Sequence, residues 1–457
     1  MKIEQLQNKK IAILWFWKEG QSALKFLEKQ GIEDITILDK NQFQSSSFSI
    51  KGGNSKVDYV FWDSYLDNLE DFDVIIKTPG ISPFHEKILP YKDKCISGTQ
   101  IFFSHYTGKV IGITGTKGKS TVSTLLYTCL QKAGYNIKLV WNIGAPVLDE
   151  IDVFWDEKYD YIVYEMSSYM LQDFTPKLEI WFLNNIYPCH LDWHYDSWGI
   201  YKEAKLNLLV NASTQIINGD FSMDSDVASI PWKKVYFNSK GKYTYDENNF
   251  YIEKEKVFDG KIALLWEHNR KNISWVIAIL DTIMTEKWIL KDTLQEVLPY
   301  FKWLPNRIED IGVYEGIRFI NDAIATTPES SIAAIDTFWS ELQSLFVWGE
   351  DSGFNFSTIR SAILESSIQN IVAFPDTSEK IFPEIGARDY EKAFEIEIEW
   401  KTLQFIKTRS MKQGVDFIYK TTLPWKVALL SCAAPSFSLW KNYLQKAEEF
   451  KKEVQEY

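Results

Sequence analysis

The sequence predicts an α/β protein of three domains, each built around a parallel sheet. Short apolar runs alternate with helical patterns along the chain, as in strand–helix–strand units. A glycine-rich turn joins an apolar strand to a helix within residues 110–126, which is typical of phosphate-binding folds. The length of 457 residues suits about two to four domains.

The composition indicates a globular, acidic protein. Hydrophobic residues make up 45% of the chain, charged residues 25%, and the net charge is −12. An acidic balance disfavours nonspecific nucleic-acid binding. No apolar run reaches the ~20 residues that cross a bilayer, the N-terminal MKIEQLQNKK lacks a signal-peptide core, and the scattered cysteines suit a reducing compartment. We therefore expect a cytoplasmic monomer without nucleic-acid or membrane partners.

The first predicted domain covers residues 1–106. Its expected strands are the apolar runs at residues 11–14, 35–39, 58–62 and 73–80. A helix is expected at residues 21–29, after the turn that follows the first strand. Asp39 ends the second strand, where nucleotide-binding folds often keep an acid for a ribose. A solvated strand-end carboxylate is the alternative role for Asp39.

The second predicted domain covers residues 107–308 and contains the strongest motif, VIGITGTKGKSTVSTLL. Backbone N–H groups and the helix N-terminus in such a turn hold phosphates, while a lysine and a hydroxyl serve the outer phosphates and Mg²⁺. Further strands are expected at residues 161–168 and 180–186. We expect ATP to be bound by Gly115, Thr116, Lys117, Gly118, Lys119, Ser120 and Thr121.

The third predicted domain covers residues 309–457. The segment 317–326 opens this unit, strands are expected at residues 344–350 and 426–432, and a polar-faced helix closes the chain. This alternation again predicts an α/β unit.

The glycine-rich loop resembles that of the Mur ligases, G-x-T-G-T-N-G-K-S-T, with Lys117 in place of asparagine. Further motifs resemble this family in chain order, and most resemble its MurD branch of UDP-N-acetylmuramoyl-alanine:glutamate ligases. The resemblance implies a Rossmann-like UDP-sugar domain, a central P-loop ATPase domain and a Rossmann-like amino-acid domain. It also implies that ATP converts the carboxylate of UDP-N-acetylmuramoyl-L-alanine (UDP-MurNAc-L-Ala) to an acyl phosphate. The amine of glutamate then attacks this group once the domains have closed.

The resemblance assigns metal and catalytic roles in the central domain. Glu165 in YEMSSYMLQ and His190 in NNIYPCHLDWH match Mg²⁺ ligands, together with Ser120. Lys205 in YKEAKLNLL matches a lysine that is carbamoylated in this family. We expect Lys119, His190 and Lys205 to be catalytic. The alternatives are a helix cap for Glu165, a structural histidine, and a solvated lysine.

Other positions are assigned by shorter matches. The expected nucleotide contacts are Asn269, Asn272, Arg307 and Asp322. The expected contacts to the UDP-sugar or the amino acid are Asp39, Asn142, Ser167, Ser436 and Tyr443.

Two positions depart from the family pattern. Ile324 and Ser352 stand where lysines are usual. Because these lysines serve the region where the amino acid meets ATP, their loss leaves open whether D- or L-glutamate is added.

Tryptophan is unusually frequent and glycine scarce. The chain has 18 Trp and 22 Gly, whereas ordinary glycine usage of about 7% predicts about 32. Seven tryptophans stand where the family pattern has glycine: Trp15, Trp17, Trp141, Trp266, Trp303, Trp348 and Trp425. We hypothesise that these residues are glycine in the native protein, through a UGA codon that some bacteria reassign. A divergent enzyme with repacked loops is the alternative.

Two other functions stay open. The first is a related Mur ligase, or a folylpolyglutamate synthetase-like ligase, with another amino acid or acceptor; the MurD-like segment 429–443 argues against it. The second is a nucleotide-binding paralogue without catalysis. Retention of Lys119, Glu165, His190 and Lys205 argues against that loss.

Overall fold

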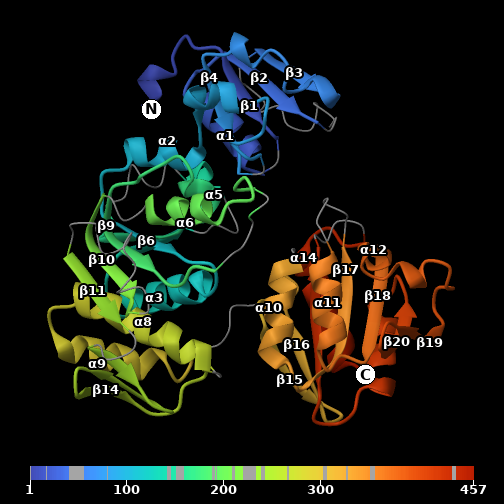
Figure 1. Ribbon diagram of the computed structural model, residues 1–457. Helices are drawn as coiled ribbons and strands as arrows, with labels where there is room; N and C mark the ends of the chain where they lie inside the picture. Colours follow the sequence, from blue (N-terminus) through green and yellow to red (C-terminus); the bar gives the residue numbers. More distant parts are fainter. Residues whose placement is uncertain are drawn as a thin grey trace. The chain divides into compact units, whose positions relative to one another are not determined.

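The structure is a computed structural model of the chain that divides into two compact units, Met1–Phe301 and Lys302–Tyr457 (Figure 1). The residue boundaries of the three predicted domains stay predictions. The structure describes all residues except 1, 17, 41–55, 80, 141–145, 151–158, 188–190, 192, 208–210, 220–232, 238–241, 265–266, 302–305, 326–327, 350–355 and 435–438.

The first sheet is entirely parallel, with the strand order β3-β2-β1-β4-β5. Its strands are β1 (Ile11–Leu14), β2 (Asp34–Asp39), β3 (Lys56–Phe61), β4 (Val74–Lys77) and β5 (Cys95–Ile96). Helix α1 (Lys18–Lys29) follows β1, and α2 (Gly98–His105) follows β5. Helix α1 begins earlier than predicted because the turn after Leu14 is short.

The second sheet is also parallel, with the order β11-β10-β9-β6-β8-β7. Its strands are β6 (Val110–Thr114), β7 (Ile137–Val140), β8 (Tyr161–Glu165), β9 (Leu178–Leu183), β10 (Ala212–Asn218) and β11 (Lys233–Phe237). The helices of this region are α3 (Lys119–Lys132), α5 (Ser168–Leu171), α6 (Trp198–Leu206), α8 (Glu267–Ile283) and α9 (Lys287–Val297). Strand β6 lies inside the sheet, so the phosphate loop starts from a fully buried strand.

A small antiparallel sheet follows, which the sequence reasoning missed. It consists of β12 (Tyr243–Tyr245), β13 (Asn249–Ile252) and β14 (Glu255–Asp259). These strands are only three to five residues long, and fewer than half of their side chains are buried.

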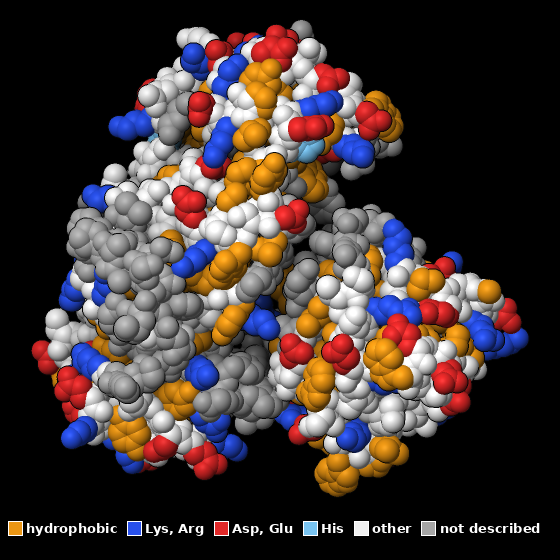
Figure 2. All heavy atoms as spheres, in the orientation of Figure 1, with side chains coloured by type: hydrophobic (Ala, Val, Ile, Leu, Met, Phe, Trp, Pro, Cys, Tyr) orange, Lys and Arg blue, Asp and Glu red, His pale blue; other side chains and the backbone are white. Residues whose placement is uncertain are grey.

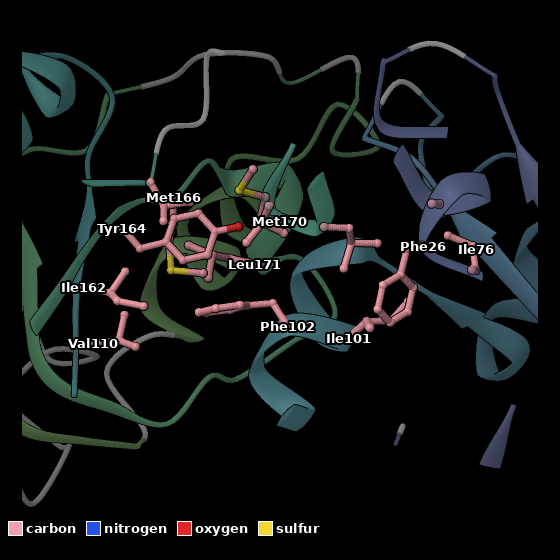
Figure 3. Packing of buried hydrophobic residues seen from close by; sticks show 14 of the residues in the cluster. Phe26, Ile76, Ile101, Phe102, Val110, Ile162, Tyr164, Met166, Met170 and Leu171 are labelled. Carbon is pink, nitrogen blue, oxygen red and sulfur yellow. The ribbon is translucent and has the colours of Figure 1, made fainter. Parts of the chain in front are cut away.

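One hydrophobic core joins the first two sheets. The cluster includes Phe26 and Ile76 from the first sheet region and Ile162 and Met170 from the second. Figure 3 shows Phe102 of α2 between these groups. This shared core explains why both sheets belong to one compact unit.

The second unit contains a mixed sheet with the order β15-β16-β21-β17-β18-β20-β19. Its strands are β15 (Glu309–Tyr314), β16 (Ile317–Asn321), β17 (Leu342–Gly349), β18 (Asn370–Asp376), β19 (Ala393–Ile398), β20 (Lys401–Lys407) and β21 (Val427–Ala433). Its helices are α10 (Pro328–Phe338), α11 (Ser357–Glu365), α12 (Thr377–Ile381), α13 (Met411–Thr421) and α14 (Tyr443–Gln455). The inner strands are parallel, whereas β15 and β19 add antiparallel edges that were not predicted.

Both faces of this inner sheet are covered. Phe346 and Leu430 belong to the cluster that contains Phe450 of α14, while their strand neighbours Leu345 and Leu429 are fully buried as well. Parallel strands with two buried faces are typical of α/β folds. The predicted α/β class is thus confirmed in both units.

Several tryptophans occupy backbone conformations that favour glycine. Trp15, Trp62 and Trp425 have φ values of 66°, 69° and 70°, in the left-handed region that bulky residues rarely adopt. Trp425 is also 85% exposed, which is unusual for the most hydrophobic aromatic. Trp15 and Trp425 belong to the glycine hypothesis, and their backbone angles support it. Of the other five positions, four lie outside the described residues, and the side chain of Trp348 is not described.

Two hairpin loops also contain residues at positive φ. Glu315 and Gly316 form the loop between β15 and β16, with φ values of 47° and 80°. Glu399 and Trp400 form the corresponding loop between β19 and β20, with Glu399 at 56°. Trp400 itself is not among the residues at positive φ, so the backbone of this hairpin does not call for glycine at position 400.

Candidate active site

The phosphate loop joins the end of β6 to the start of α3. Gly115 and Gly118 have φ values of 151° and 82°, and Gly118 is the N-cap of α3. A Cβ atom on Gly118 would lie 2.5 Å from Asn184 Nδ2 and 2.7 Å from Asn272 Oδ1. Both the angles and the space therefore require glycine, which leaves backbone N–H groups and the α3 N-terminus accessible to phosphate.

Two asparagines after β9 hold this loop in place. Asn185 Oδ1 accepts the N–H groups of Thr116 and Lys117, at 3.0 and 2.9 Å. Asn185 Nδ2 donates to the carbonyl of Lys117 at 3.1 Å, as does Asn184 Nδ2. The loop shape is therefore set by the neighbouring strand end as well as by its own glycines.

Two lysines converge on the carbonyl oxygen of Gly115. Lys119 Nζ donates to it at 3.0 Å and to the Thr116 carbonyl at 3.2 Å. Lys205 Nζ, on α6, donates to the same Gly115 oxygen at 3.0 Å. Lys205 is only 2% exposed, so the alternative of a solvated surface charge is wrong. Its carbamoylation stays a prediction.

Glu165 ends β8 next to the start of the phosphate loop. Ile113 of β6 is its register partner. The side chain is 1% exposed, and no hydrogen bond to Oε2 is found within the described part of the chain. Ser167, rather than Glu165, caps the following helix by accepting the Met170 N–H.

The donor set around Glu165 suits a hard cation. A buried carboxylate without a partner is costly, and Mg²⁺ prefers carboxylate and hydroxyl oxygens near phosphate. Ser120, buried at the start of α3, supplies a hydroxyl. In the described ranges no group of three or more His, Cys, Asp or Glu side chains is placed to hold a metal. The third predicted ligand, His190, lies outside the described residues.

The first turn of α8 closes another side of the loop. Asn269 and Asn272 are both buried, and Asn272 Nδ2 donates to Asn269 Oδ1 at 3.1 Å. Gly118 brings α3 close to this pair, because the Cβ it lacks would meet Asn272. The structure thus brings both predicted nucleotide-binding asparagines to the phosphate loop.

A cavity of about 190 Å³ lies between the first two sheets. Its lining includes Lys18 and Glu19 at the start of α1, Lys77 at the end of β4, and Thr99 at the start of α2. Ser22 also lines it, and its buried Oγ has no hydrogen-bond partner among the described residues. Two helix starts and a cation around a buried hydroxyl form a polar site suited to an anionic ligand.

Burial shifts two ionisable groups of this cavity. The pKa of Glu19 is raised to about 7 by burial, against the opposing charge of Lys77. The pKa of Lys77 is lowered to about 8, also mainly by burial. Lys77 Nζ donates to the Ile81 carbonyl at 2.8 Å and lies over the Trp193 ring.

Comparison with known proteins relates this geometry to a family. Residues 113–280 match the profile of the Mur ligase middle domain. A UDP-N-acetylmuramoylalanine–D-glutamate ligase from Acetivibrio thermocellus is 28% identical over 475 residues, covering 99% of this chain and 97% of that protein. Residues 113–280 thus match the Mur ligase middle domain, and the chain is similar to Mur ligases over nearly its full length.

Other relatives of the chain carry a different amino-acid name. A UDP-N-acetylmuramoyl-L-alanine–L-glutamate ligase from Xanthomonas axonopodis pv. citri is also 28% identical, covering 98% of this chain and 96% of that protein. Among solved structures, the UDP-N-acetylmuramate-alanine ligase MurC from Thermotoga maritima matches with a TM-score of 0.56 at 16% identity, covering 98% of this chain and all of that one. MurF from Thermotoga maritima in complex with ADP matches with a TM-score of 0.53 at 13% identity, covering 99% of this chain and 97% of that one. These structures support the fold.

In the second unit, Asp322 follows β16 and is buried. Its Oδ2 accepts the Ser431 hydroxyl at 2.9 Å, and its Oδ1 accepts the Ile308 N–H at 3.1 Å. Burial raises the pKa of Asp322 to about 7, and the nearby charge of Arg307 opposes the rise. The structure therefore brings Asp322 and Arg307 close to each other. Ile324 lies in the same segment, where its N–H donates to the Asn306 carbonyl.

Of the remaining predicted residues, the structure describes Asp39 and Tyr443. Asp39 Oδ2 accepts the Phe16 N–H at 2.7 Å, and the residue is 4% exposed; the alternative of a solvated Asp39 is therefore wrong. Tyr443 opens α14 and is half-buried. Asn142, Ser436 and Ser352 lie outside the described residues, as does His190.

Sequence reasoning missed the groups that support the site. Asn184, Asn185, Glu19 and Lys77 were not predicted. The adjacent asparagines at the end of an apolar strand were the available signal, because polar residues at the carboxyl end of a parallel strand often serve a ligand site. Glu19 and Lys77 gave no such signal, since their importance comes from burial between two sheets.

Proposed function

We propose that the chain is a Mur ligase that uses ATP to add glutamate to UDP-MurNAc-L-Ala in peptidoglycan precursor synthesis. One observation carries the proposal most strongly: the buried Glu165 carboxylate, whose Oε2 has no hydrogen-bond partner among the described residues, stands beside a phosphate loop that contains Lys119. Full-length similarity to proteins named as glutamate ligases supports the choice of substrates.

The chemistry follows from the charges at the loop. A carboxylate oxygen of the acceptor attacks the γ-phosphorus of ATP and ADP leaves. The glutamate nitrogen then attacks the acyl carbon, phosphate departs with the bonding electrons, and the amine loses a proton. Lys119 would give up its hydrogen bonds to the loop carbonyls and donate to phosphate oxygens instead. The N–H groups at the start of α3 would neutralise charge as the phosphoryl group moves. Mg²⁺, held by Ser120, Glu165 and His190, would supply further charge neutralisation.

Lys205 would carry a carbamate in the active enzyme. Its burial and its position against the Gly115 carbonyl place it at the loop. Carbamoylation would replace a cation by an anion there, which would favour binding of Mg²⁺.

The cavity between the first two sheets would hold part of the UDP-sugar. Lys77, the two helix starts and the Ser22 hydroxyl, which has no hydrogen-bond partner in the described ranges, suit a diphosphate or sugar hydroxyls. The raised pKa of Glu19 reduces the negative charge that this residue brings to an anionic ligand.

L-glutamate is a specific second candidate for the amino acid. Ile324 and Ser352 replace lysines that D-glutamate-adding relatives are expected to have. Relatives named for either stereoisomer match this chain equally well, at 28% identity.

We also propose that the enzyme is a cytoplasmic monomer without nucleic-acid or membrane partners. None of the helices in the described part of the chain is long and apolar enough to cross a membrane. On the face shown in Figure 2, basic and acidic side chains are interspersed over the described surface, and the net charge is −12.

The test is a phosphate-release assay with ATP, Mg²⁺, UDP-MurNAc-L-Ala and a panel of amino acids. We expect release only when acceptor and glutamate are both present, with product mass confirming the amide. D- and L-glutamate are compared directly. Release that is independent of every amino acid would overturn the ligase proposal, and preference for another amino acid would overturn the glutamate assignment.

A further inference from the structure

Arg307 lies in a backbone turn of unusual conformation at the start of the second unit. Its neighbours Asn306 and Ile308 have φ values of 66° and 45°. Asparagine tolerates the left-handed region, but a β-branched isoleucine there is a genuine outlier. Such a turn persists only when surrounding groups hold it.

Glu309 supplies one side of that support. Its Oε2 accepts the Asn306 N–H at 2.8 Å and Asn321 Nδ2 at 3.0 Å. Asn321 Nδ2 also lies 3.0 Å from Asn306 Oδ1. Lys451, on α14, neutralises the carboxylate at 2.7 Å. The Glu309 carboxylate therefore joins the turn to β16 and to the C-terminal helix.

Asp322 supplies the other side. It accepts the Ile308 N–H, while the Asn306 carbonyl accepts the Ile324 N–H at 3.1 Å. The backbone is therefore fixed on both sides of Arg307, and the direction in which the Arg307 side chain leaves it is defined.

We propose that Glu309 is a positioning residue for Arg307: its carboxylate holds the Asn306–Ile308 turn and so presents the guanidinium for the ATP-dependent reaction. The inference rests on the proposed function only for the role of Arg307 toward phosphate. The role of Glu309 in the turn can be measured without any activity.

The main variant is Glu309→Ala, with Asp310→Ala as the matched control. Asp310 is the adjacent acid on β15; its carboxylate pairs with Arg318 at 2.6 Å and accepts the Gly312 N–H. We expect Glu309→Ala to lower kcat by about 10-fold or more, because misplaced charge in a transition state is costly. Asp310→Ala should stay within about twofold of wild type.

Glu309→Gln separates hydrogen bonding from charge. Its amide oxygen can still accept the Asn306 N–H, but its NH₂ group faces Lys451. We expect intermediate kcat, with the melting temperature close to that of Asp310→Ala. A kcat for Glu309→Gln equal to that of Glu309→Ala, with both variants folded, would contradict a role through the turn hydrogen bonds.

A double-mutant cycle with Arg307→Ala decides whether Glu309 acts through Arg307. In the Arg307→Ala background, Glu309→Ala should change kcat by less than about twofold, since the group being positioned is gone. Full additivity of the two losses would overturn the inference.

Hydrogen exchange gives a readout independent of catalysis. Peptides covering residues 306–310 should exchange faster in Glu309→Ala than in wild type or Asp310→Ala, while peptides from α13 should be unchanged. If wild type lacks amino-acid-dependent phosphate release, the proposed function fails, yet the exchange result still tests the turn. Unchanged exchange at 306–310 would overturn the positioning role.

Discussion

Two strand-to-helix turns in the first unit make the same connection with opposite residues. The turn from β6 to α3 uses Gly115 and Gly118 at positive φ, and its helix opens on Lys119. The turn from β1 to α1 places Trp15 at a φ of 66°, and its helix opens on Lys18 and Glu19. Both turns follow a buried strand and begin with a residue at positive φ, but one begins with glycine and the other with tryptophan.

The comparison shows that a backbone can hold a conformation that favours glycine at a position where the sequence has another residue. Gly118 leaves room for packed asparagines, whereas Trp15 places an indole in a conformation that disfavours any Cβ. In the phosphate loop, the glycines suit both the backbone angles and the space around them. The first turn is locally inconsistent, and such conflicts mark either function or a misassigned residue.

The largest expected effect tests the phosphate loop. Lys119→Ala should reduce amino-acid-dependent phosphate release by at least about 100-fold, because a preorganised cation at the phosphoryl group is lost. Lys132→Ala, at the other end of α3, removes a surface pair with Glu296 and should leave the rate unchanged. Steady-state assays with matched melting temperatures check this. Equal rates for the two variants would favour the non-catalytic paralogue.

The next effect tests why the loop needs glycine. Gly118→Ala adds a Cβ against the Asn184 and Asn272 amides at a φ of 82°, where strain costs about 1–3 kcal/mol. We expect ATP affinity to fall by about 10-fold or more, measured by calorimetry.

Gly134→Ala is the control for this substitution. Gly134 has a φ of 89° but open space around its missing Cβ. It should lose stability and retain ATP binding. If Gly134→Ala weakens ATP binding as much as Gly118→Ala does, local crowding is not the reason for the loop glycine.

A smaller effect tests the acid that opens α1. The pKa of Glu19 is about 7 in the folded protein and 4.5 ordinarily, so folding binds a proton between these values. Stability from this group is therefore lost as pH rises from 4.5 through 7. Glu19→Gln should be more stable than wild type at pH 8 by about 2 kcal/mol, and much closer to wild type at pH 5.

Urea unfolding at the two pH values measures this difference. Glu33→Gln, an exposed acid beyond α1, should differ from wild type by the same amount at both. A Glu19→Gln difference independent of pH would show that this carboxyl does not bind an extra proton on folding.

The smallest effect tests the tryptophans. Trp425→Gly should stabilise the protein by about 1 kcal/mol, because the left-handed backbone disfavours side chains and the exposed indole contributes little packing. Trp15→Gly should remove the same backbone strain, but it also removes the packing of the indole against the core. Trp181→Gly, a fully buried position on β9, should instead cost about 3–5 kcal/mol.

Peptide mass spectrometry of the native protein addresses the hypothesis directly. Glycine masses at positions 15 and 425 are expected. Tryptophan masses at both would favour a divergent enzyme with repacked loops.

Much of the fold followed from local patterns. Continuous apolar runs such as residues 11–14 and the Gly-Lys-Ser-Thr helix start were readable because burial and phosphate binding leave strong signatures. The antiparallel edges were not, because β15 and β19 bury few side chains and so lack the continuous apolar runs of the inner strands. Lys205 was chosen by resemblance alone, since no local pattern indicates that a helical lysine will be buried.

The shared carbonyl of Gly115 has a thermodynamic consequence. Lys119 and Lys205 both donate to this oxygen at 3.0 Å, so two like charges are held at one acceptor. Any modification that removes the charge of Lys205 would change the free energy needed to release Lys119 toward a nucleotide. By reciprocity, nucleotide binding would shift the modification equilibrium of Lys205 by the same factor. The dependence of ATP affinity on dissolved carbon dioxide would then report how strongly these two equilibria are linked.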